Sequence, residues 1–314
     1  RYAVWQGLLV NLMLSSNGEH LRDGEWTPPR RERLIRYVVA RYAAYNVIFG
    51  GGEEIDQYDN KAPTPDPQKD AKLREFVESL HRADPYHRMV GLHAADYDHI
   101  LVPDAVDIVQ TQYGGRKDGK FKRTDYELMR QRARQFSKPF INSETAYFSR
   151  VDPDPDLAQA ETFRRIAWRV MLAGAAGYTY GNAHVVIGGT GGPSAPPSIS
   201  VSDLEEPGIH EMRKLAVWHK QAGLDLSEFN QFFELSDNRY SAVSPGNRYV
   251  VYVEDKRWQA LVLDLSTSNS KFTGRWFDIA KGVFAKPISL QGGRKHRIAA
   301  PGPWHVLYLG PQGP

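Results

Sequence analysis

The sequence has 314 residues, of which 41% are hydrophobic and 25% charged, values that exclude a disordered or fibrous chain. The 40 Lys and Arg residues nearly balance the 37 Asp and Glu residues, and the net charge of +3 argues against a nucleic-acid-binding stripe or a polybasic membrane surface. The absence of cysteine excludes disulfides, thiolate zinc sites and cysteine nucleophiles.

Six short apolar runs in the first two thirds of the chain have the character of β-strands. Most of them are apolar without alternation, which is typical of parallel strands buried on both faces. The runs cover residues 8–14, 45–51, 87–93, 106–112, 138–144 and 175–181.

Amphipathic segments lie between most of these runs and predict helices. Pro28 with Pro29, then Pro67, and finally Pro155 with Asp156 stand where helix starts prefer such residues. Strands and helices in alternation indicate parallel βα units rather than a sandwich. The predicted helices cover residues 28–44, 67–84, 124–136, 156–174 and 208–223.

A (β/α)₈ barrel needs eight strands, and six candidates are visible. If they are strands three to eight, the first two βα units of the barrel are missing from this chain. A doubly wound open sheet also fits the count, but the position of two acids favours the barrel. We therefore predict an α/β fold, a TIM-type barrel lacking its first strands, over residues 1–223.

The pattern of apolar and polar residues changes after Leu224. Short runs with a period of two, separated by turn residues, predict a small antiparallel β-sandwich domain over residues 224–314. The clearest runs are residues 232–235, 240–245, 249–255, 259–266, 275–279 and 305–310.

The stretch FGGGEE, residues 49–54, ends the second strand-like run. In a βα barrel such strand ends build the active site, and glycines there let a ligand approach the main chain. If Glu53 and Glu54 continue the strand, they point to opposite sides, so one of them faces the pocket. The alternative is a solvated acidic loop.

A second acid, Glu144, ends the run 138–144. An apolar strand gives no structural reason for a carboxylate, unless it is buried in a pair with Arg164 or Arg41. Two carboxylates that face each other over a barrel mouth can protonate a leaving group and attack it or activate water, which is the chemistry of glycoside hydrolysis. The pair carries more weight than either acid alone.

Other strand ends carry hydrogen-bonding groups and aromatic rings, which are common in sugar sites, although such residues also serve packing. Neither a phosphate-binding loop nor a serine-hydrolase elbow is present, and the histidines lack metal-ligand spacing, so no metal and no cofactor are expected. The candidate substrate-binding residues are His93, Gln112, Tyr113, Tyr147, Tyr180 and His184.

The chain resembles the apiosidase-like glycoside hydrolase family, whose members combine a (β/α)₈ barrel with a small β domain whose name refers to collagen binding. The resemblance lies in residues 36–54, 138–148, 163–181 and 275–282. It implies a glycosidase for plant cell-wall glycans, with Glu144 as nucleophile or base and Glu54 as acid. Three glycines before two glutamates depart from the family pattern, which leaves Glu53 as an alternative acid, and Phe49 replaces the usual Trp.

Two functions of different classes follow. The first is an extracytoplasmic glycoside hydrolase, periplasmic or secreted, whose partner is an oligosaccharide or polysaccharide, with no nucleic acid and no membrane insertion. The second is a carbohydrate-binding or scaffold protein on a barrel that has lost catalysis. A metal-dependent hydrolase is disfavoured because His and Asp residues do not cluster in the sequence.

Overall fold

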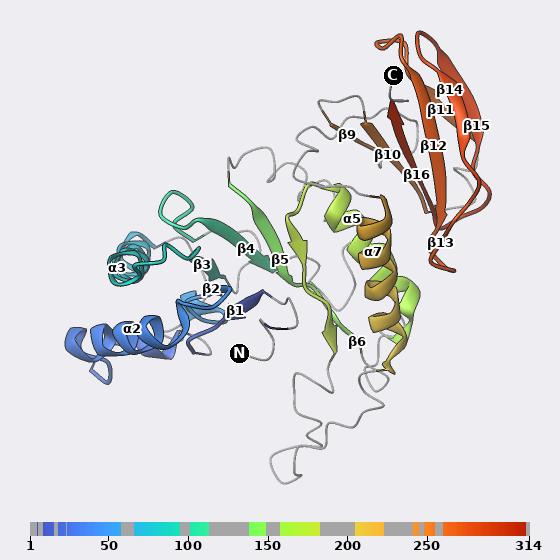
Figure 1. Ribbon diagram of the computed structural model, residues 1–314. Coiled ribbons are helices and arrows are strands. Elements are labelled where there is room, and N and C mark those ends of the chain that lie inside the picture. Colours follow the sequence, from blue (N-terminus) through green and yellow to red (C-terminus); the bar gives the residue numbers. More distant parts are fainter. Residues whose placement is uncertain are drawn as a thin grey trace. The chain divides into compact units, whose positions relative to one another are not determined.

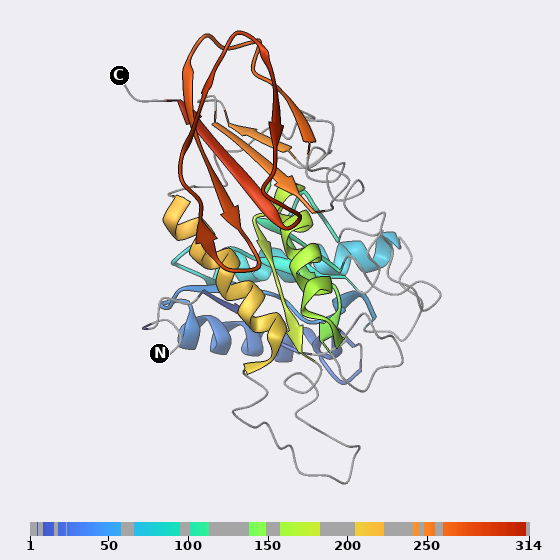
Figure 2. The same cartoon turned by 90° about the vertical axis from the view of Figure 1, so that its right-hand side faces the viewer.

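The protein, described by a computed structural model, forms two compact units, one of residues 1–115 with 133–145 and the other of residues 116–132 with 146–314. Figure 1 labels their helices and strands, and Figure 2 shows the same elements from a second side. The structure describes residues 5, 9–15, 18–22, 24–57, 66–94, 101–112, 138–148, 158–182, 205–222, 241–244, 248–254 and 260–311.

Parallel strands in chain order form the centre of the first unit (Figure 1). β1 pairs with β2, and β3 pairs with β4, which in turn pairs with β5. A parallel bridge between Phe49 and Val90 connects the end of β2 with the start of β3. This succession is that of a barrel wall built from βα units. The strands are β1 (Val10–Leu12), β2 (Val47–Phe49), β3 (Gly91–His93), β4 (Ile108–Gln112) and β5 (Phe140–Glu144).

The helices α2 (Pro28–Tyr42) and α3 (Pro67–Ala83) of the first unit begin at the predicted prolines. Proline suits the first helical position because the N–H that it lacks would have no partner inside the helix. In α3 the Asp66 side chain also accepts a hydrogen bond from the Gln68 backbone N–H over 2.9 Å, as a good N-cap does. The helix predicted over residues 124–136 lies outside the described residues.

The second unit begins with short strands and two helices. β6 (Tyr147–Phe148) pairs in parallel with β8 (Gly181–Asn182), and β7 (Gly177–Tyr178) precedes β8 in the chain. The helices are α5 (Ala160–Leu172) and α7 (Pro207–Ala222). α5 follows an N-cap at Gln159, and the proline and aspartate predicted to open this helix lie outside the described residues.

Antiparallel strands make up the remainder of the second unit. One sheet has the order β13-β12-β16-β10-β9, with β14 also paired to β12, and β11 pairs separately with β15. In β11, Leu261 and Leu263 are fully buried whereas Val262 between them is 41% exposed, the alternation of a strand with one face in a core. The strands are β9 (Ser241–Ser244), β10 (Arg248–Val253), β11 (Ala260–Asp264), β12 (Lys271–Asp278), β13 (Val283–Phe284), β14 (Ile288–Gln291), β15 (Lys295–Ala299) and β16 (His305–Pro311).

The helical part of the second unit and its antiparallel strands share a buried aromatic contact. Trp168 of α5 meets Trp218 of α7 edge to face, with ring centroids 4.9 Å apart, and stacks on Tyr252 of β10 at 5.8 Å. All three side chains are almost fully buried. Aromatic contacts of this kind add stability beyond the burial of apolar surface. The antiparallel region is therefore packed onto α5 and does not hang from it on a linker.

Candidate active site

The glycine segment, residues 50–54, continues the pairing of β1 and β2 beyond the end of β2. The Gly50 N–H donates to the Leu12 carbonyl over 2.9 Å, and the Glu53 N–H donates to the Ser15 carbonyl over 3.0 Å. Gly51 has a φ of +66°, and a Cβ there would lie 2.5 Å from Cδ2 of Leu92. Both the backbone conformation and the lack of space require glycine at position 51. The hydrogen bonds of Gly50 and Glu53 place the two glutamates beside the residues that follow β1.

Glu54 connects the ends of two strands. Its Oε1 accepts a hydrogen bond from Nε2 of Gln112, at the end of β4, over 3.2 Å. Its Oε2 accepts a second one from Nε2 of Gln57 over 3.1 Å. The backbone of Glu54 has a φ of 45°, in the left-handed region that residues with a side chain seldom adopt. Such a conformation costs about 1 to 3 kcal/mol and is most often retained where function needs it.

Glu144 is the last residue of β5 and lies next to a bulge. Thr111 is opposite Asn142, but Gln112 is opposite Glu144, so Ser143 is an extra residue in the ladder. Bulges re-aim the side chain that follows them and are frequent beside active sites. The Glu144 side chain is 18% exposed, so most of it is shielded from water.

His93, the last residue of β3, lies close to Glu144. Its Nε2 is 3.7 Å from Oε2 of Glu144, within ion-pair range but too long for a hydrogen bond. Burial lowers the pKa of His93, while the charges of Glu144, Glu53, Glu54 and Asp56 act to raise it. The lowered pKa favours a neutral ring. A neutral imidazole can donate through one nitrogen and accept through the other, which suits a sugar hydroxyl.

Neither ring nitrogen of His93 has a hydrogen-bond partner among the described residues, although the residue is only 2% exposed. Buried polar groups without partners are rare and call for an explanation. A ligand hydroxyl at the strand ends would supply the missing partner. This observation supports the prediction that His93 contacts substrate, without testing it.

The two arginines that could have explained Glu144 as a buried ion pair have other contacts. Arg164 donates to both carboxylate oxygens of Glu211, over 2.7 and 2.9 Å. The Arg41 guanidinium lies over the rings of Tyr37 and Tyr42. Within the described ranges no Lys or Arg forms an ion pair with Glu144, so a structural pair does not account for this carboxylate.

The other predicted site residues fall into two groups. Tyr180 packs edge to face against Phe163, with ring centroids 5.2 Å apart, beside the buried Phe148, and its hydroxyl is buried. The Tyr147 ring lies against Gly181, where an added Cβ would come within 2.6 Å of it. Both rings thus have packing contacts. Tyr113 and His184 lie outside the described residues.

Sequence reasoning missed a hydrogen bond between two polar side chains, one on β1 and one on β4. Asn11 of β1 donates from Nδ2 to Oε1 of Gln110 of β4 over 3.2 Å, and Gln110 is only 1% exposed. A polar residue inside an otherwise apolar strand run was the available signal in both cases. Since the amides bond to each other, they link β1 to β4 within the first unit.

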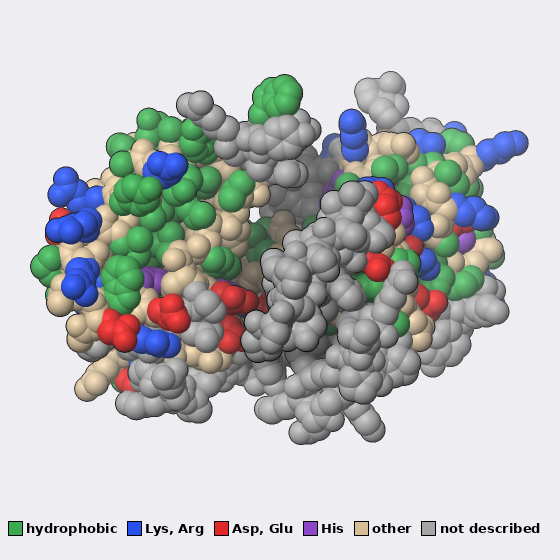
Figure 3. Space-filling view, turned by 90° about the horizontal axis from the view of Figure 1, so that it is seen from below, with side chains coloured by type: hydrophobic (Ala, Val, Ile, Leu, Met, Phe, Trp, Pro, Cys, Tyr) green, Lys and Arg blue, Asp and Glu red, His purple; other side chains and the backbone are tan. Residues whose placement is uncertain are grey.

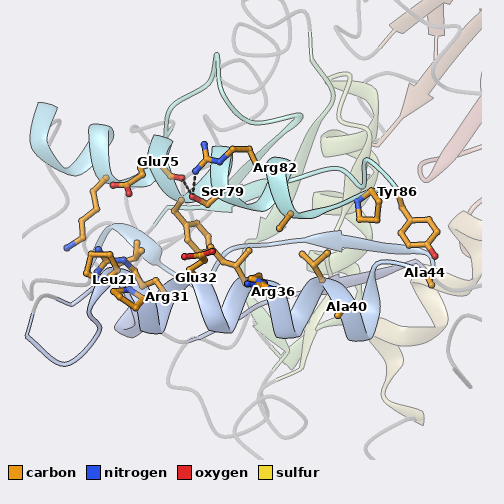
Figure 4. A pocket seen from close by; sticks show the side chains of 18 residues that line it. Leu21, Arg31, Glu32, Arg36, Ala40, Ala44, Glu75, Ser79, Arg82 and Tyr86 are labelled. Carbon is orange, nitrogen blue, oxygen red and sulfur yellow. Dashed lines mark hydrogen bonds between the residues drawn. The ribbon is translucent and has the colours of Figure 1, made fainter.

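A groove of about 780 Å³ runs between α2 and α3, away from the acids (Figure 4). Its floor is apolar, with Ile35 and Phe76, and its rim carries charges of both signs, among them Arg36 and Glu75. None of the candidate catalytic residues lines this groove. This groove is therefore not the proposed catalytic site.

The described residues show neither a metal-ligand cluster nor, on the face in Figure 3, a concentration of basic side chains. On the face in Figure 3, the described Lys and Arg side chains are scattered among apolar and acidic ones. No three His, Asp or Glu residues within the described ranges are arranged to hold a metal ion. Of the helices that the structure describes, none combines the length and the apolar character needed to cross a membrane.

Parallel strands in chain order, with acids at the ends of β2 and β5, define an α/β protein with a TIM-like barrel fold. The chain belongs to the apiosidase-like family, because the model of the family's catalytic domain, "Apiosidase-like, catalytic domain", matches residues 2–221. The family resemblance is thereby confirmed. None of the curated proteins matches the chain.

Two solved structures share the fold at low sequence identity. One, described as "Glycoside hydrolase", aligns with 98% of this chain and 74% of its own at 18% identity, with a TM-score of 0.72. The other, a glycoside hydrolase family 5 structure from Bacteroides vulgatus ATCC 8482, aligns with 98% of this chain and 72% of its own at 16% identity, with a TM-score of 0.71. The predicted fold class, parallel α/β followed by an antiparallel β region, is confirmed.

Proposed function

We propose that the protein hydrolyses a glycosidic bond with Glu144 and Glu54 as the working carboxylates. The observation that carries the proposal is the position of Gln112, which donates a hydrogen bond to Glu54 over 3.2 Å and lies opposite Glu144 in the ladder of β4 and β5. His93, whose Nε2 lies 3.7 Å from Glu144, adds a buried polar group beside that carboxylate. Glycoside hydrolysis needs two carboxyl groups, one on each side of the scissile bond. Family membership implies a carbohydrate substrate.

In this proposal Glu54 donates the proton to the leaving oxygen. The hydrogen bonds from Gln112 and Gln57 fix its carboxyl group, which favours Glu54 over Glu53 as the acid. Glu144 attacks the anomeric carbon if configuration is retained, or takes a proton from water if it is inverted. A glycan of the plant cell wall is the substrate class that the family favours.

The first experiment tests Glu144. The wild-type protein is screened on 4-nitrophenyl glycosides and pectic oligosaccharides, and Glu144→Gln is then assayed on the best substrate. We expect kcat to fall by at least about 10³-fold with an unchanged melting temperature, because the amide can neither attack nor take a proton. Glu78→Gln, a change of an exposed glutamate on α3, is the matched control. Full activity of Glu144→Gln would overturn the proposal.

A second variant separates the two mechanisms. In Glu144→Gly, added azide can occupy the space of a missing nucleophile and restore turnover of an activated aryl glycoside, with a glycosyl azide as product. Recovery with inverted product indicates a retaining enzyme whose nucleophile is Glu144. Binding of oligosaccharide by the wild type without any hydrolysis would instead favour a carbohydrate-binding protein.

A further inference from the structure

A serine–histidine pair, of which the histidine is buried, lies against the glycine segment. Oγ of Ser15 and Nδ1 of His20 are 2.6 Å apart, a short hydrogen bond. His20 is 1% exposed, and its ring packs on Phe76 of α3 with centroids 4.7 Å apart. The ring of His20 is thus held by Phe76 of α3 and by the hydrogen bond to Ser15.

The same pair touches the backbone that carries the acids. The Ser15 carbonyl accepts the Glu53 N–H over 3.0 Å. A Cβ at Gly52 would lie 3.1 Å from the carbonyl oxygen of Ser15, 3.2 Å from its Oγ and 3.6 Å from Cε1 of His20. Gly52 therefore rests directly on the pair, two residues before Glu54.

We propose that Ser15 and His20 are positioning residues for the proposed reaction, which hold the glycine segment so that its glutamate reaches the leaving group. The inference rests on the proposed function. Neither side chain is assigned to the chemistry itself, since the Ser15 hydroxyl is engaged by a histidine that water does not reach. Placement matters because a displacement of about 1 Å at a catalytic group can cost about 10²-fold in rate.

The charge state of His20 agrees with this role. Burial first, and the positive charge of Arg31 on α2 second, lower its pKa from 6.5 to about 4. The imidazole is therefore neutral at neutral pH and can share one hydrogen bond with Ser15. Its Nε2 has no hydrogen-bond partner among the described residues, so the bond to Ser15 fixes the ring.

The test compares Ser15→Ala, His20→Ala and His20→Asn with the wild type on two probes. A phenyl glycoside needs a proton on its leaving oxygen, whereas a 2,4-dinitrophenyl glycoside leaves without help. We expect Ser15→Ala and His20→Ala to lower kcat by about 10-fold on the phenyl glycoside and by less than about 3-fold on the activated one, with little change in KM. His20→Asn keeps a polar group near the position of Nδ1 and should restore most of the loss.

A second readout does not depend on catalysis. Hydrogen exchange of the Glu53 amide should accelerate by about 10-fold in Ser15→Ala, because its acceptor is no longer held by the pair. Ser79→Ala on α3, whose hydroxyl donates to the Glu75 carbonyl of its own helix, is the matched serine control and should change neither exchange nor rate. Melting curves establish that each variant is folded.

The outcomes separate the two proposals. Unchanged Glu53 exchange in folded Ser15→Ala and His20→Ala overturns the positioning role even if the protein is a glycosidase. Equal loss on both probes also overturns it, since the defect would then lie outside proton donation. If Glu144→Gln is fully active, the proposed function fails, whereas the exchange result still decides whether the pair holds the segment.

Discussion

The side-chain amide of Gln112 donates a hydrogen bond to Oε1 of Glu54 over 3.2 Å. In the ladder of β4 and β5, Gln112 also lies opposite Glu144. Gln112 thus connects Glu54 to the strand position opposite Glu144. Since amide donors orient a carboxyl group without adding a charge, Gln112 can fix Glu54 and leave the electrostatics of Glu144 nearly unchanged.

Replacement of Gln112 by leucine should therefore impair turnover. We expect kcat on an aryl glycoside to fall by about 10-fold, because the carboxyl group that donates the proton is then no longer held by the amide of β4, and a displacement of about 1 Å at a catalytic group can cost about 10²-fold in rate. The measurement is kcat and KM of Gln112→Leu beside Gln57→Leu, which removes the second donor to the same carboxylate. A larger loss for Gln57→Leu would show that the link to β4 is not the important one.

The strands and their parallel direction could be predicted because buried parallel strands are continuously apolar, and six such runs were visible. The antiparallel strand β15 (Lys295–Ala299) escaped prediction for the opposite reason. Its sequence KHRIA alternates between intermediate and exposed positions and has hardly any apolar signal. Its place comes from pairing with β11, a contact that local sequence does not encode.

The acids could be predicted from their position, but their geometry could not. An apolar strand that ends in glycines and glutamates marks Glu54, and a carboxylate at the end of β5 marks Glu144. The bulge at Ser143 and the hydrogen bond from Gln112 depend on register between strands that are far apart in the chain. The pair of Ser15 and His20 gave no sequence signal either, because a serine and a histidine five residues apart form no recognised motif.

The left-handed backbone of Glu54 predicts a conflict between stability and function. Glu54→Gly and Glu54→Ala both remove the carboxylate, so both should lose activity. At a φ of 45°, alanine carries a steric penalty that glycine avoids, and we expect the glycine variant to be more stable by up to about 1 kcal/mol. Urea unfolding of the two variants measures the difference. If alanine is the more stable one, the residue is not held in a strained conformation.

The ion pairs between Glu254, which follows β10, and two arginines of α5 should contribute measurably to the free energy of unfolding. Arg169 donates to both of its carboxylate oxygens, over 2.8 and 2.7 Å, and Nε of Arg165 lies 2.9 Å from one of them. The Glu254 side chain is 11% exposed and that of Arg169 20%, so the loss of Glu254 removes both carboxylate acceptors of a largely buried guanidinium group. We expect Glu254→Ala to lower the free energy of unfolding by about 2 to 4 kcal/mol.

The matched control is Glu161→Ala, because Glu161 binds the same Arg165 from an exposed position on α5, over 3.2 Å. Exposed pairs of this kind contribute about 0.3 to 0.5 kcal/mol. Chemical unfolding monitored by tryptophan fluorescence reports both variants, since Trp168 and Trp218 lie in the same buried contact. Equal effects of the two substitutions would contradict the proposed difference in burial.

His20 predicts an acid-sensitive stability. Its pKa is about 4 in the folded protein and 6.5 in the unfolded chain, so between these values the unfolded chain binds a proton that the folded protein does not. The contribution of neutral His20 to the free energy of unfolding is therefore fully present above pH 6.5 and is lost as the pH falls toward 4. A difference of this size corresponds to about 3 kcal/mol.

The measurement is the free energy of unfolding of wild type and His20→Asn at pH 7 and at pH 4. The wild type should lose more stability than the variant, because asparagine does not titrate. The pKa of His93 is also lowered by burial and acts in the same direction. Since His93 is present in both proteins, its contribution cancels in the comparison. Equal losses in the two proteins would mean that His20 is protonated without cost in the folded state, and hence that it is not enclosed between Ser15 and Phe76.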